Sequence, residues 1–252
     1  MHIKPIKTKK FRAPKDDVLP EIFRCIESIE EGSILVITSK VVSIDQGRCV
    51  PVNVVDKDEL IKKESELFLP RTFVPEEHVL HTITNDTLIA SAGIDASNAD
   101  DHYILWPKDL EETLKEWYKV LKEHYEIENF GILIVDSRSM PMRRGVVGIA
   151  IGSMGFHRLN DYRESVDIFN RPIKFSQVNI PDALAAAAVV TMGETNEQTP
   201  LALICDVPFV VFGDEMNNKK HSEYVVPKED DIYKPFLDVP WQKGGKGATT
   251  SI

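Results

Sequence analysis

The sequence feature that most constrains the fold is the segment of residues 130–137, FGILIVDS, in which an apolar run leads into Asp136 and Ser137. The run is too short to cross a membrane, and it is typical of a buried strand, which here ends at Asp136. Residues 34–42 form a second run, rich in β-branched residues, that follows the helix-breaking Gly32. Buried strands need other elements packed against them, so the two runs predict a layered domain with a sizeable core.

Helices and further strands are expected on both sides of these runs. The clearest helix is residues 107–125, in which Leu110, Leu114 and Trp117 belong to one apolar stripe. Other helices are expected at 17–30, 57–68 and 181–194, and other strands at 86–93, 145–152, 172–180 and 200–212. Because helices and strands mix without a regular strand–helix–strand order, we expect an α+β fold of mixed sheets with packed helices. One unit is expected over residues 1–240, followed by a mobile tail over 241–252.

Composition narrows the class of protein. The chain has 252 residues and a net charge of −10. This charge disfavours a general binder of nucleic acid or of membrane surfaces, because such binding requires positive charge. The three cysteines lie far apart without metal-ligand spacing, which is typical of a reducing interior. The basic N-terminus has no apolar core region, so we predict no signal peptide and expect a cytoplasmic protein.

The stretch AGIDASN, residues 92–98, is a candidate ligand-binding loop. Small residues around Asp95 allow the backbone to come close to a ligand. The carboxylate of Asp95 suits a hard cation, and the amide of Asn98 suits a hydrogen bond to a base or phosphate. The alternative is an ordinary turn in which both side chains bond to the local backbone.

A second candidate segment follows the apolar strand. Asp136 ends that strand directly beside the hydroxyl of Ser137, an arrangement suited to metal or phosphate chemistry. Arg143 and Arg144 follow in the same segment, and arginine forks match phosphate and carboxylate oxygens in pairs. The alternative is a solvated loop with surface arginines.

Two further segments carry weaker signals. In residues 191–200, Glu194 follows an alanine-rich helix; the alternative here is a helix cap at Gly193 beside a surface acid. Ser39 and Lys40 are expected to close the strand 34–42. Neither a P-loop pattern nor a glycine-rich dinucleotide fingerprint is present in the sequence.

Together and in this order, the segments resemble the coenzyme F-420:L-glutamate ligase family, whose members add γ-linked glutamate to the deazaflavin coenzyme F-420-0. The resemblance runs from about residue 16 to 206 and is densest in AGIDASN, RRGVVGIAIG, DYRESVDIFNR and DALAAAAVVTMGE. It implies a GTP-dependent amide ligase with a pair of divalent metal ions and small-molecule substrates. It also implies two lobes that interleave in a homodimer.

Carried over residue by residue, the resemblance implies a composite site. Asp95 and Asp136 would hold one metal ion, and Ser137 (usually threonine in the family) would hold the second with Glu194. Asn98 would contact the nucleotide. The remaining lining would be Ser39, Met192, Gly193, Thr195, Asn196, Glu197, Gln198 and Thr199, with residues 9–12 as an N-terminal wall. Carboxylates and a hydroxyl suit Mg²⁺ or Mn²⁺ better than zinc. GTP is the implied co-substrate, with ATP as an alternative and K⁺ as a further candidate ion.

The family's chemistry implies an acyl phosphate. Phosphoryl transfer from the nucleotide activates a carboxylate, and the amino group of the incoming amino acid then displaces phosphate. Bound metal ions would neutralise the charge that moves. We predict that Arg143 and Arg144 act catalytically by neutralising the acceptor's carboxylate or the transferred phosphoryl group.

The sequence departs from the family pattern on the substrate side. Met140 stands where the family commonly has an arginine, and Ile44 stands where it tends to have a lysine five residues after Ser39. The implied metal ligands are retained, so we expect phosphoryl chemistry with F-420-0 or another carboxylate as the acceptor. The alternatives are a ligase of the same mechanism on another acceptor or amino acid, a non-catalytic nucleotide-binding relative, and a metal-dependent phosphohydrolase.

Overall fold

The computed structural model describes residues 1–75, 78–213 and 224–246, and its largest element is a five-stranded sheet. In spatial order the strands are β1 (His2–Ile6), β12 (Leu201–Cys205), β2 (Ser33–Thr38), β8 (Phe130–Ser139) and β9 (Val146–Met154). Neighbouring strands are antiparallel except β2 and β8, which run parallel. The parallel pair brings the carboxyl ends of β2 and β8 to the same edge of the sheet.

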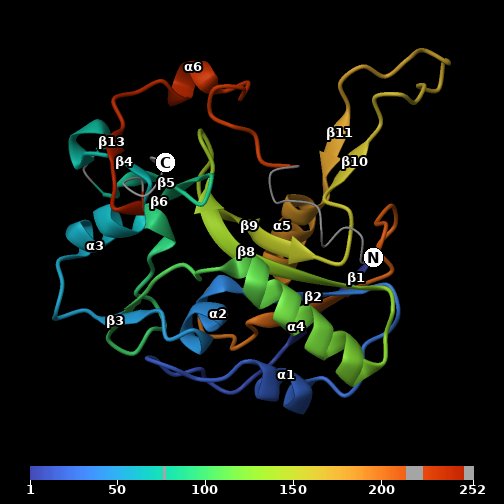
Figure 1. Cartoon of the computed structure of the whole chain (residues 1–252), viewed down its shortest axis with the longest axis horizontal. Coiled ribbons are helices and arrows are strands. Elements are labelled where there is room, and N and C mark those ends of the chain that lie inside the picture. Colours follow the sequence, from blue (N-terminus) through green and yellow to red (C-terminus); the bar gives the residue numbers. More distant parts are fainter. Residues whose placement is uncertain (76–77, 214–223, 247–252) are drawn as a thin grey trace.

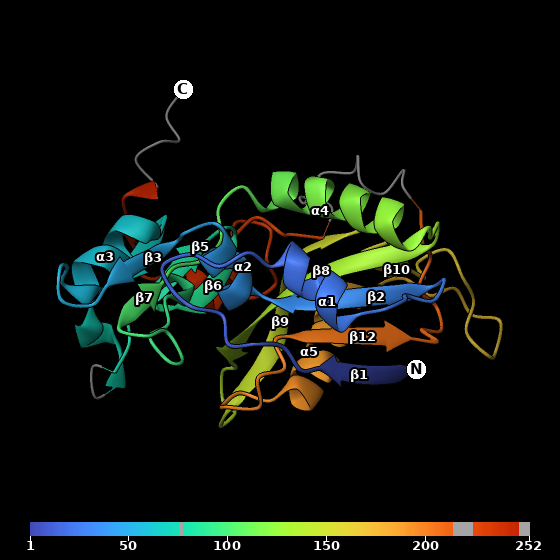
Figure 2. The ribbon, with the colours of Figure 1, turned by 90° about the horizontal axis from the view of Figure 1, so that it is seen from below.

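Helices cover both faces of this sheet (Figure 1 and Figure 2). One face carries α1 (Leu19–Cys25), α2 (Ser39–Asp45) and α4 (Leu110–Tyr125), and the other carries α5 (Ile180–Met192). Successive residues of β8 alternate between the two cores. Ile132 and Ile134 belong to the core on the α4 side, whereas Leu133 and Val135 belong to the core on the α5 side. Burial on both faces explains why the strand is apolar at successive positions.

A smaller lobe is inserted between α2 and α4. Its antiparallel sheet has the order β13 (Gln242–Lys243), β4 (Leu67–Leu69), β5 (His81–Thr84) and β6 (Thr87–Ala90). The lobe also contains α3 (Lys57–Glu64), the paired strands β3 (Cys49–Pro51) and β7 (His102–Ile104), and 3₁₀ turns at Arg71–Phe73 and Ser91–Gly93. Because β13 returns to this lobe from the C-terminal end, the two lobes interleave along the chain. The expected α+β class, with mixed sheets and packed helices, is confirmed.

The short strands β10 (Leu159–Asp161) and β11 (Gln177–Asn179) form the base of an arm that projects from the body (Figure 1). The arm carries apolar side chains that remain largely open to solvent, including Ile168 at 91% and Phe175 at 88% exposure. The helix α6 (Lys234–Leu237) belongs to the C-terminal segment. No helix within the described ranges is both long and apolar enough to cross a bilayer.

Several elements agree with the expectation from sequence. The helices expected at 107–125 and 181–194 are α4 and α5. The strands expected at 130–137 and 145–152 are β8 and β9. Of the strand expected over 200–212 only β12 is present, and of that expected over 86–93 only β6, which is followed by a 3₁₀ turn.

The expected strand 34–42 is wrong in its second half. β2 ends at Thr38, and the chain continues directly into α2. Val41 and Val42 are 5% and 0% exposed, so burial of these side chains against the core outweighs their preference for strands. Ser39 and Lys40 therefore begin a helix instead of closing a strand.

Other elements are shorter than expected. The helix expected over 17–30 is only α1, and β11 occupies only the last part of the strand expected over 172–180. The helix expected over 57–68 ends at Glu64, and β4 follows it.

The expected mobile tail begins too early. β13 pairs with β4, and the amide of Gly244 donates to the carbonyl of Glu66 at 2.8 Å. Residues 241–246 thus belong to the small lobe, because backbone pairing holds a segment that has few core-forming side chains. Residues 247–252 lie outside the described part of the chain.

Candidate active site

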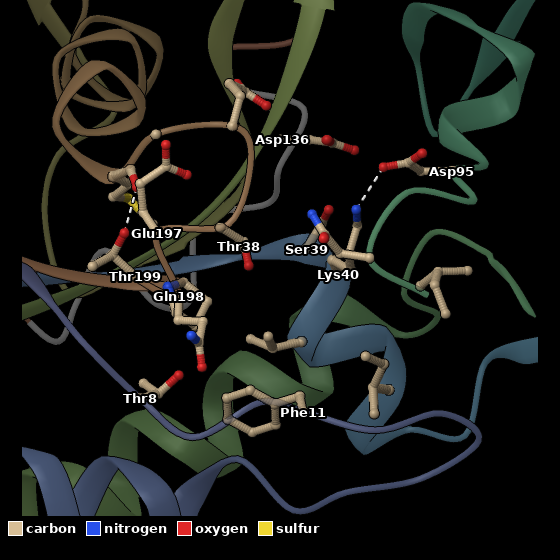
Figure 3. Close-up of a pocket in the computed structure, with 18 of the residues that line it drawn as sticks. Thr8, Phe11, Thr38, Ser39, Lys40, Asp95, Asp136, Glu197, Gln198 and Thr199 are labelled. Atoms are coloured by element: carbon tan, nitrogen blue, oxygen red, sulfur yellow. Dashed lines mark hydrogen bonds and ion pairs between the residues drawn. The ribbon is translucent and has the colours of Figure 1, made fainter. Parts of the chain in front are cut away.

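A cavity of about 580 Å³ opens where the parallel strands β2 and β8 end (Figure 3). Its lining includes every residue predicted to bind metal or nucleotide: Ser39, Asp95, Asn98, Asp136, Ser137, Met192, Gly193, Glu194, Thr195, Asn196, Glu197, Gln198 and Thr199. Residues 8–12 form another wall of the same cavity. Five segments that are distant in sequence therefore meet at one place, and the individual ligand roles remain predictions.

The end of β8 presents adjacent side chains to opposite sides of the sheet. Asp136 pairs across the sheet with Ile149, a residue of the core on the α4 side. Ser137 pairs with Gly148, where an added Cβ would lie 2.4 Å from the carbonyl oxygen of Ala185 in α5. Because side chains alternate along a strand, the carboxylate and the hydroxyl enter the cavity from different faces.

Asp136 is anchored by donors on its own side. The indole Nε1 of Trp106 donates to Asp136 Oδ2, and the amide of Ser137 donates to Oδ1 at 2.8 Å. The hydroxyl of Ser39 provides a further hydrogen bond. Burial raises the pKa of Asp136 to about 6, and these hydrogen bonds oppose the rise. The result is a carboxylate of fixed orientation at the inner end of the cavity.

Ser137 and Glu194 come together on the α5 side. Glu194 follows Gly193, which ends α5 with a φ of +80° and directs the chain toward the cavity. A hydrogen bond joins the side chains of Ser137 and Glu194. The resemblance assigns both residues to the same metal ion, and the structure places them in contact.

Asp95 both shapes its own turn and faces the cavity. Its Oδ1 accepts the amides of Ala96 and Ser97 at 2.6 and 2.8 Å, as the alternative of an ordinary turn requires. Its Oδ2 accepts the ammonium of Lys40 at 2.6 Å. Burial alone would raise the pKa of Asp95, but hydrogen bonds from Lys40 and Ser97 outweigh it and hold the pKa at about 2. Asp95 is therefore ionised at neutral pH.

Asn98 reaches across the cavity. Its side-chain amide donates to the carbonyl of Thr195 at 2.7 Å, although the two residues are 97 positions apart. This bond ties the AGIDASN loop to the loop that follows α5. Asn98 therefore does not follow the alternative of bonding only to the local backbone.

Lys40 and Trp106 line the cavity but were not among the predicted site residues. Lys40 was expected at the end of a strand, and the signal that could have identified it is a lysine immediately after a buried strand and Ser39. Trp106 sits in the apolar stretch ILW, residues 104–106, which carries no catalytic pattern. The partners of both side chains become visible only in the folded chain.

Arg143 and Arg144 are not brought to the cavity. Both are exposed in the turn between β8 and β9, where a guanidinium nitrogen of Arg143 donates to the carbonyl of Met142 at 3.2 Å. This placement follows the alternative of a solvated loop. Met140 lies in the same turn and is 41% exposed. Ile44, by contrast, lines the cavity and is buried.

The donor set suits a hard cation. Asp95, Asp136, Ser137 and Glu194 offer only oxygen atoms, the preferred ligands of Mg²⁺ and Mn²⁺. Across residues 1–75, 78–213 and 224–246, no three histidine, cysteine or acidic side chains are grouped closely enough to hold a metal ion. The residues fit divalent ions by chemistry, and binding would require the carboxylates to draw together.

Comparison with known proteins places the chain in one family. A family model described as F420-0:Gamma-glutamyl ligase matches residues 5–206. The coenzyme F420:L-glutamate ligase of Methanopyrus kandleri is 30% identical over 221 residues, covering 81% of this chain and 86% of the relative. That of Methanocaldococcus jannaschii is 30% identical over 229 residues, covering 82% and 86%. The chain therefore belongs to the F420-0:gamma-glutamyl ligase family.

Proposed function

We propose that the protein is a nucleotide-dependent ligase that joins L-glutamate to a carboxylate acceptor such as coenzyme F-420-0. Family membership supports the glutamate ligase activity. The observation that carries the proposal is one shared cavity, where three acids and a hydroxyl from three separate segments meet. Its volume is in the range of known cofactor sites, which is about 300–1,000 Å³.

Two divalent ions, Mg²⁺ or Mn²⁺, are proposed for this cavity. Asp95 and Asp136 would hold one ion, and Ser137 and Glu194 would hold the other. The two-sided end of β8 supports this division, because Asp136 and Ser137 enter from opposite faces. When bound, such ions neutralise charge on the phosphate oxygens during transfer.

GTP is the proposed co-substrate, and ATP is the alternative. Ser39, Asn98 and the loop from Met192 to Thr199 would bind it, with residues 8–12 as a further wall. Figure 3 shows Thr8 beside Gln198, and the amide of Thr8 donates to the carbonyl of Gln198 at 2.9 Å. The buried Ile44 makes part of this wall apolar, so nucleotide affinity must depend on other groups where the family tends to use a lysine.

The reaction proceeds in two proposed steps. An acceptor carboxylate oxygen attacks the γ-phosphorus, the bond to the nucleoside diphosphate breaks, and an acyl phosphate forms. The amino nitrogen of glutamate then attacks the acyl carbon, the bond to phosphate breaks, and the nitrogen loses a proton. The cavity contributes by holding the two reactants in line, which converts a bimolecular step into a local one.

For Arg143 and Arg144, we propose only a role in binding the acceptor. Their exposed turn lies outside the cavity lining, so they could contact only a part of the acceptor that extends beyond the cavity. The double variant R143A/R144A is expected to raise KM for the acceptor while leaving nucleotide affinity unchanged. Weakened nucleotide binding with an unchanged acceptor KM would contradict this role.

A homodimer is also proposed. The projecting arm supports it, because Ile168, Phe169 and Phe175 are each at least 67% exposed, and exposed apolar clusters commonly mark protein interfaces. Sedimentation analysis of the purified protein tests the assembly. If the protein is a monomer at micromolar concentration, the homodimer proposal is wrong, and the ligase proposal is unaffected.

The decisive experiment is a product assay. The protein is incubated with F-420-0, L-glutamate, GTP or ATP, and Mg²⁺ or Mn²⁺, and products are identified by mass spectrometry. Glutamylated deazaflavin is expected, with none formed after chelation by EDTA or with D136N. Phosphate release that does not depend on glutamate would favour a phosphohydrolase, and nucleotide binding without turnover would favour a non-catalytic relative.

A second arm of the assay addresses the acceptor. Hydroxylamine traps an acyl phosphate as a hydroxamate, so it reports activation of any carboxylate before the amine attacks. Failure with F-420-0 but hydroxamate formation with another carboxylate would favour a ligase of the same mechanism on a different acceptor.

A further inference from the structure

Lys40 places a positive charge among the acids of the cavity. Its ammonium contacts Asp95 Oδ2 at 2.6 Å, the carbonyl of Ser97 at 2.7 Å and the hydroxyl of Ser97 at 3.1 Å. Figure 3 shows the side chain reaching from the start of α2 into the cavity toward Asp95. With three acceptors at these distances, the ammonium is bound in the manner of a coordinated cation.

The influence of Lys40 extends beyond Asp95. The same ammonium interacts electrostatically with Asp136 and Glu194, which the resemblance assigns to two different metal ions. Like charges near one another are costly in a partly dehydrated site. The charge of Lys40 therefore acts on all three carboxylates and favours their ionised forms.

The position of Lys40 in α2 indicates that its charge is stabilised by the acids of the cavity and not by its own helix. It lies in the first turn of α2, which has no acidic residue to offset its charge. A cation there gains nothing from the helix dipole, which favours anions at that end. Its side chain is 25% exposed, so it has given up part of its hydration to reach Asp95.

We propose that Lys40 is an internal counter-ion that occupies the place of the first divalent ion in the metal-free protein and leaves Asp95 when that ion binds. The inference rests on the metal sites of the proposed function. An ion on Asp95 Oδ2 would compete with the ammonium for the same oxygen atom, and two cations so close repel each other. Lys40 is thus a positioning residue that holds the carboxylate of Asp95 in place and sets a threshold for metal binding.

The first test measures whether Lys40 moves. The wild-type protein is labelled with an amine-reactive reagent with and without Mn²⁺, in the absence of nucleotide, and labelling at each lysine is read by mass spectrometry. Lys40 should label several times faster with Mn²⁺. Lys115, which pairs with Glu111 at 2.7 Å on α4 away from the cavity, is the internal reference and should not change. Unchanged or slower labelling of Lys40 while Mn²⁺ is bound would overturn the proposal.

The second test measures competition. Free Mn²⁺ is titrated by electron paramagnetic resonance with the wild type, K40M, K40R and the matched control K115M. K40M should bind Mn²⁺ about fivefold more tightly than the wild type, because a competing ion pair is removed. K40R retains the positive charge, and K115M retains Lys40 as the competing cation. Both variants should therefore bind Mn²⁺ with an affinity close to that of the wild type. Mn²⁺ should also raise the melting temperature of K40M more than that of the wild type.

The outcomes separate this inference from the proposed function. Mn²⁺ binding that is equal or weaker in K40M, with a positive product assay for the wild type, overturns only the counter-ion role. Absence of Mn²⁺ binding in both the wild type and K40M overturns the metal sites and this role together. Should K40M fail to fold, the labelling experiment on the wild type decides alone.

Discussion

Gly93 offers a sharp test of how the AGIDASN loop controls the cavity. Its φ is +71°, and a Cβ built there would lie 2.1 Å from Nε1 and 2.3 Å from Cε2 of Trp106. Trp106 is 2% exposed and donates through Nε1 to Asp136. The substitution G93A would therefore strain the backbone and also drive the indole away from the carboxylate that it anchors.

The expected magnitude has two parts. Placing alanine at a left-handed backbone position costs about 1–2 kcal/mol. Overpacking against a buried ring adds about 1–3 kcal/mol. G93A should thus lower the free energy of unfolding by roughly 2–5 kcal/mol, and displacement of Trp106 should reduce ligase activity further in the fraction that remains folded.

Gly145 provides the matched control. Its φ is +86°, but an added Cβ would meet nothing within 4 Å. G145A should therefore show the backbone cost alone, about 1–2 kcal/mol, with nucleotide affinity unchanged. Urea unfolding of both variants and of the wild type measures the difference. Equal losses in G93A and G145A would refute the reasoning, because they would show that the indole does not limit the space at Gly93.

Two further predictions concern the cavity loop and the N-terminal helix. N98A should weaken nucleotide binding about five- to tenfold through loss of a polar contact, measured by calorimetry. N160A removes a similar 2.7 Å bond, to the carbonyl of Phe209, and should leave nucleotide binding unchanged. Hydrogen bonds from Arg24 hold the pKa of Glu21 at about 2 against its burial, so its stabilisation is complete above about pH 4.5 and is lost as the pH falls toward 2. E21Q should flatten the fall in unfolding free energy over that range, and an acid titration as steep as that of the wild type would contradict this.

The elements that the sequence predicts well are those whose pattern depends on burial alone. α4 has an apolar stripe at helical spacing, and β8 is apolar because both of its faces are covered. The same rule misleads at Val41 and Val42, where burial is real but the backbone is helical. A short apolar run cannot distinguish a buried strand from a buried helix, because the run records the environment and not the backbone.

Most of the residues predicted for the site line one cavity, but the contacts between them were not predicted. Family resemblance indicated that Asp95, Asp136 and Glu194 belong together, which no local spacing could show. The contact of Lys40 with Asp95 spans 55 positions, so it depends on how the two lobes meet. The arginine pair illustrates the opposite error, since closeness to Asp136 in sequence suggested a shared site. β8 continues beyond Asp136 to Ser139 and carries the arginines out to an exposed turn.

Asp136 and Ser137 point to opposite faces at the end of β8, and this limits which changes in chain length the enzyme can tolerate. Deleting one residue between Phe130 and Asp136 would preserve a strand but exchange its faces, so the carboxylate would point toward α5 and the hydroxyl toward α4. The turn at residues 140–145 is exposed and lies beyond Ser137, the last residue of β8 that lines the cavity, so extra residues there would leave the register of Asp136 and Ser137 intact. Libraries that seek new acceptors should therefore vary the length of this turn and keep the length of β8 constant.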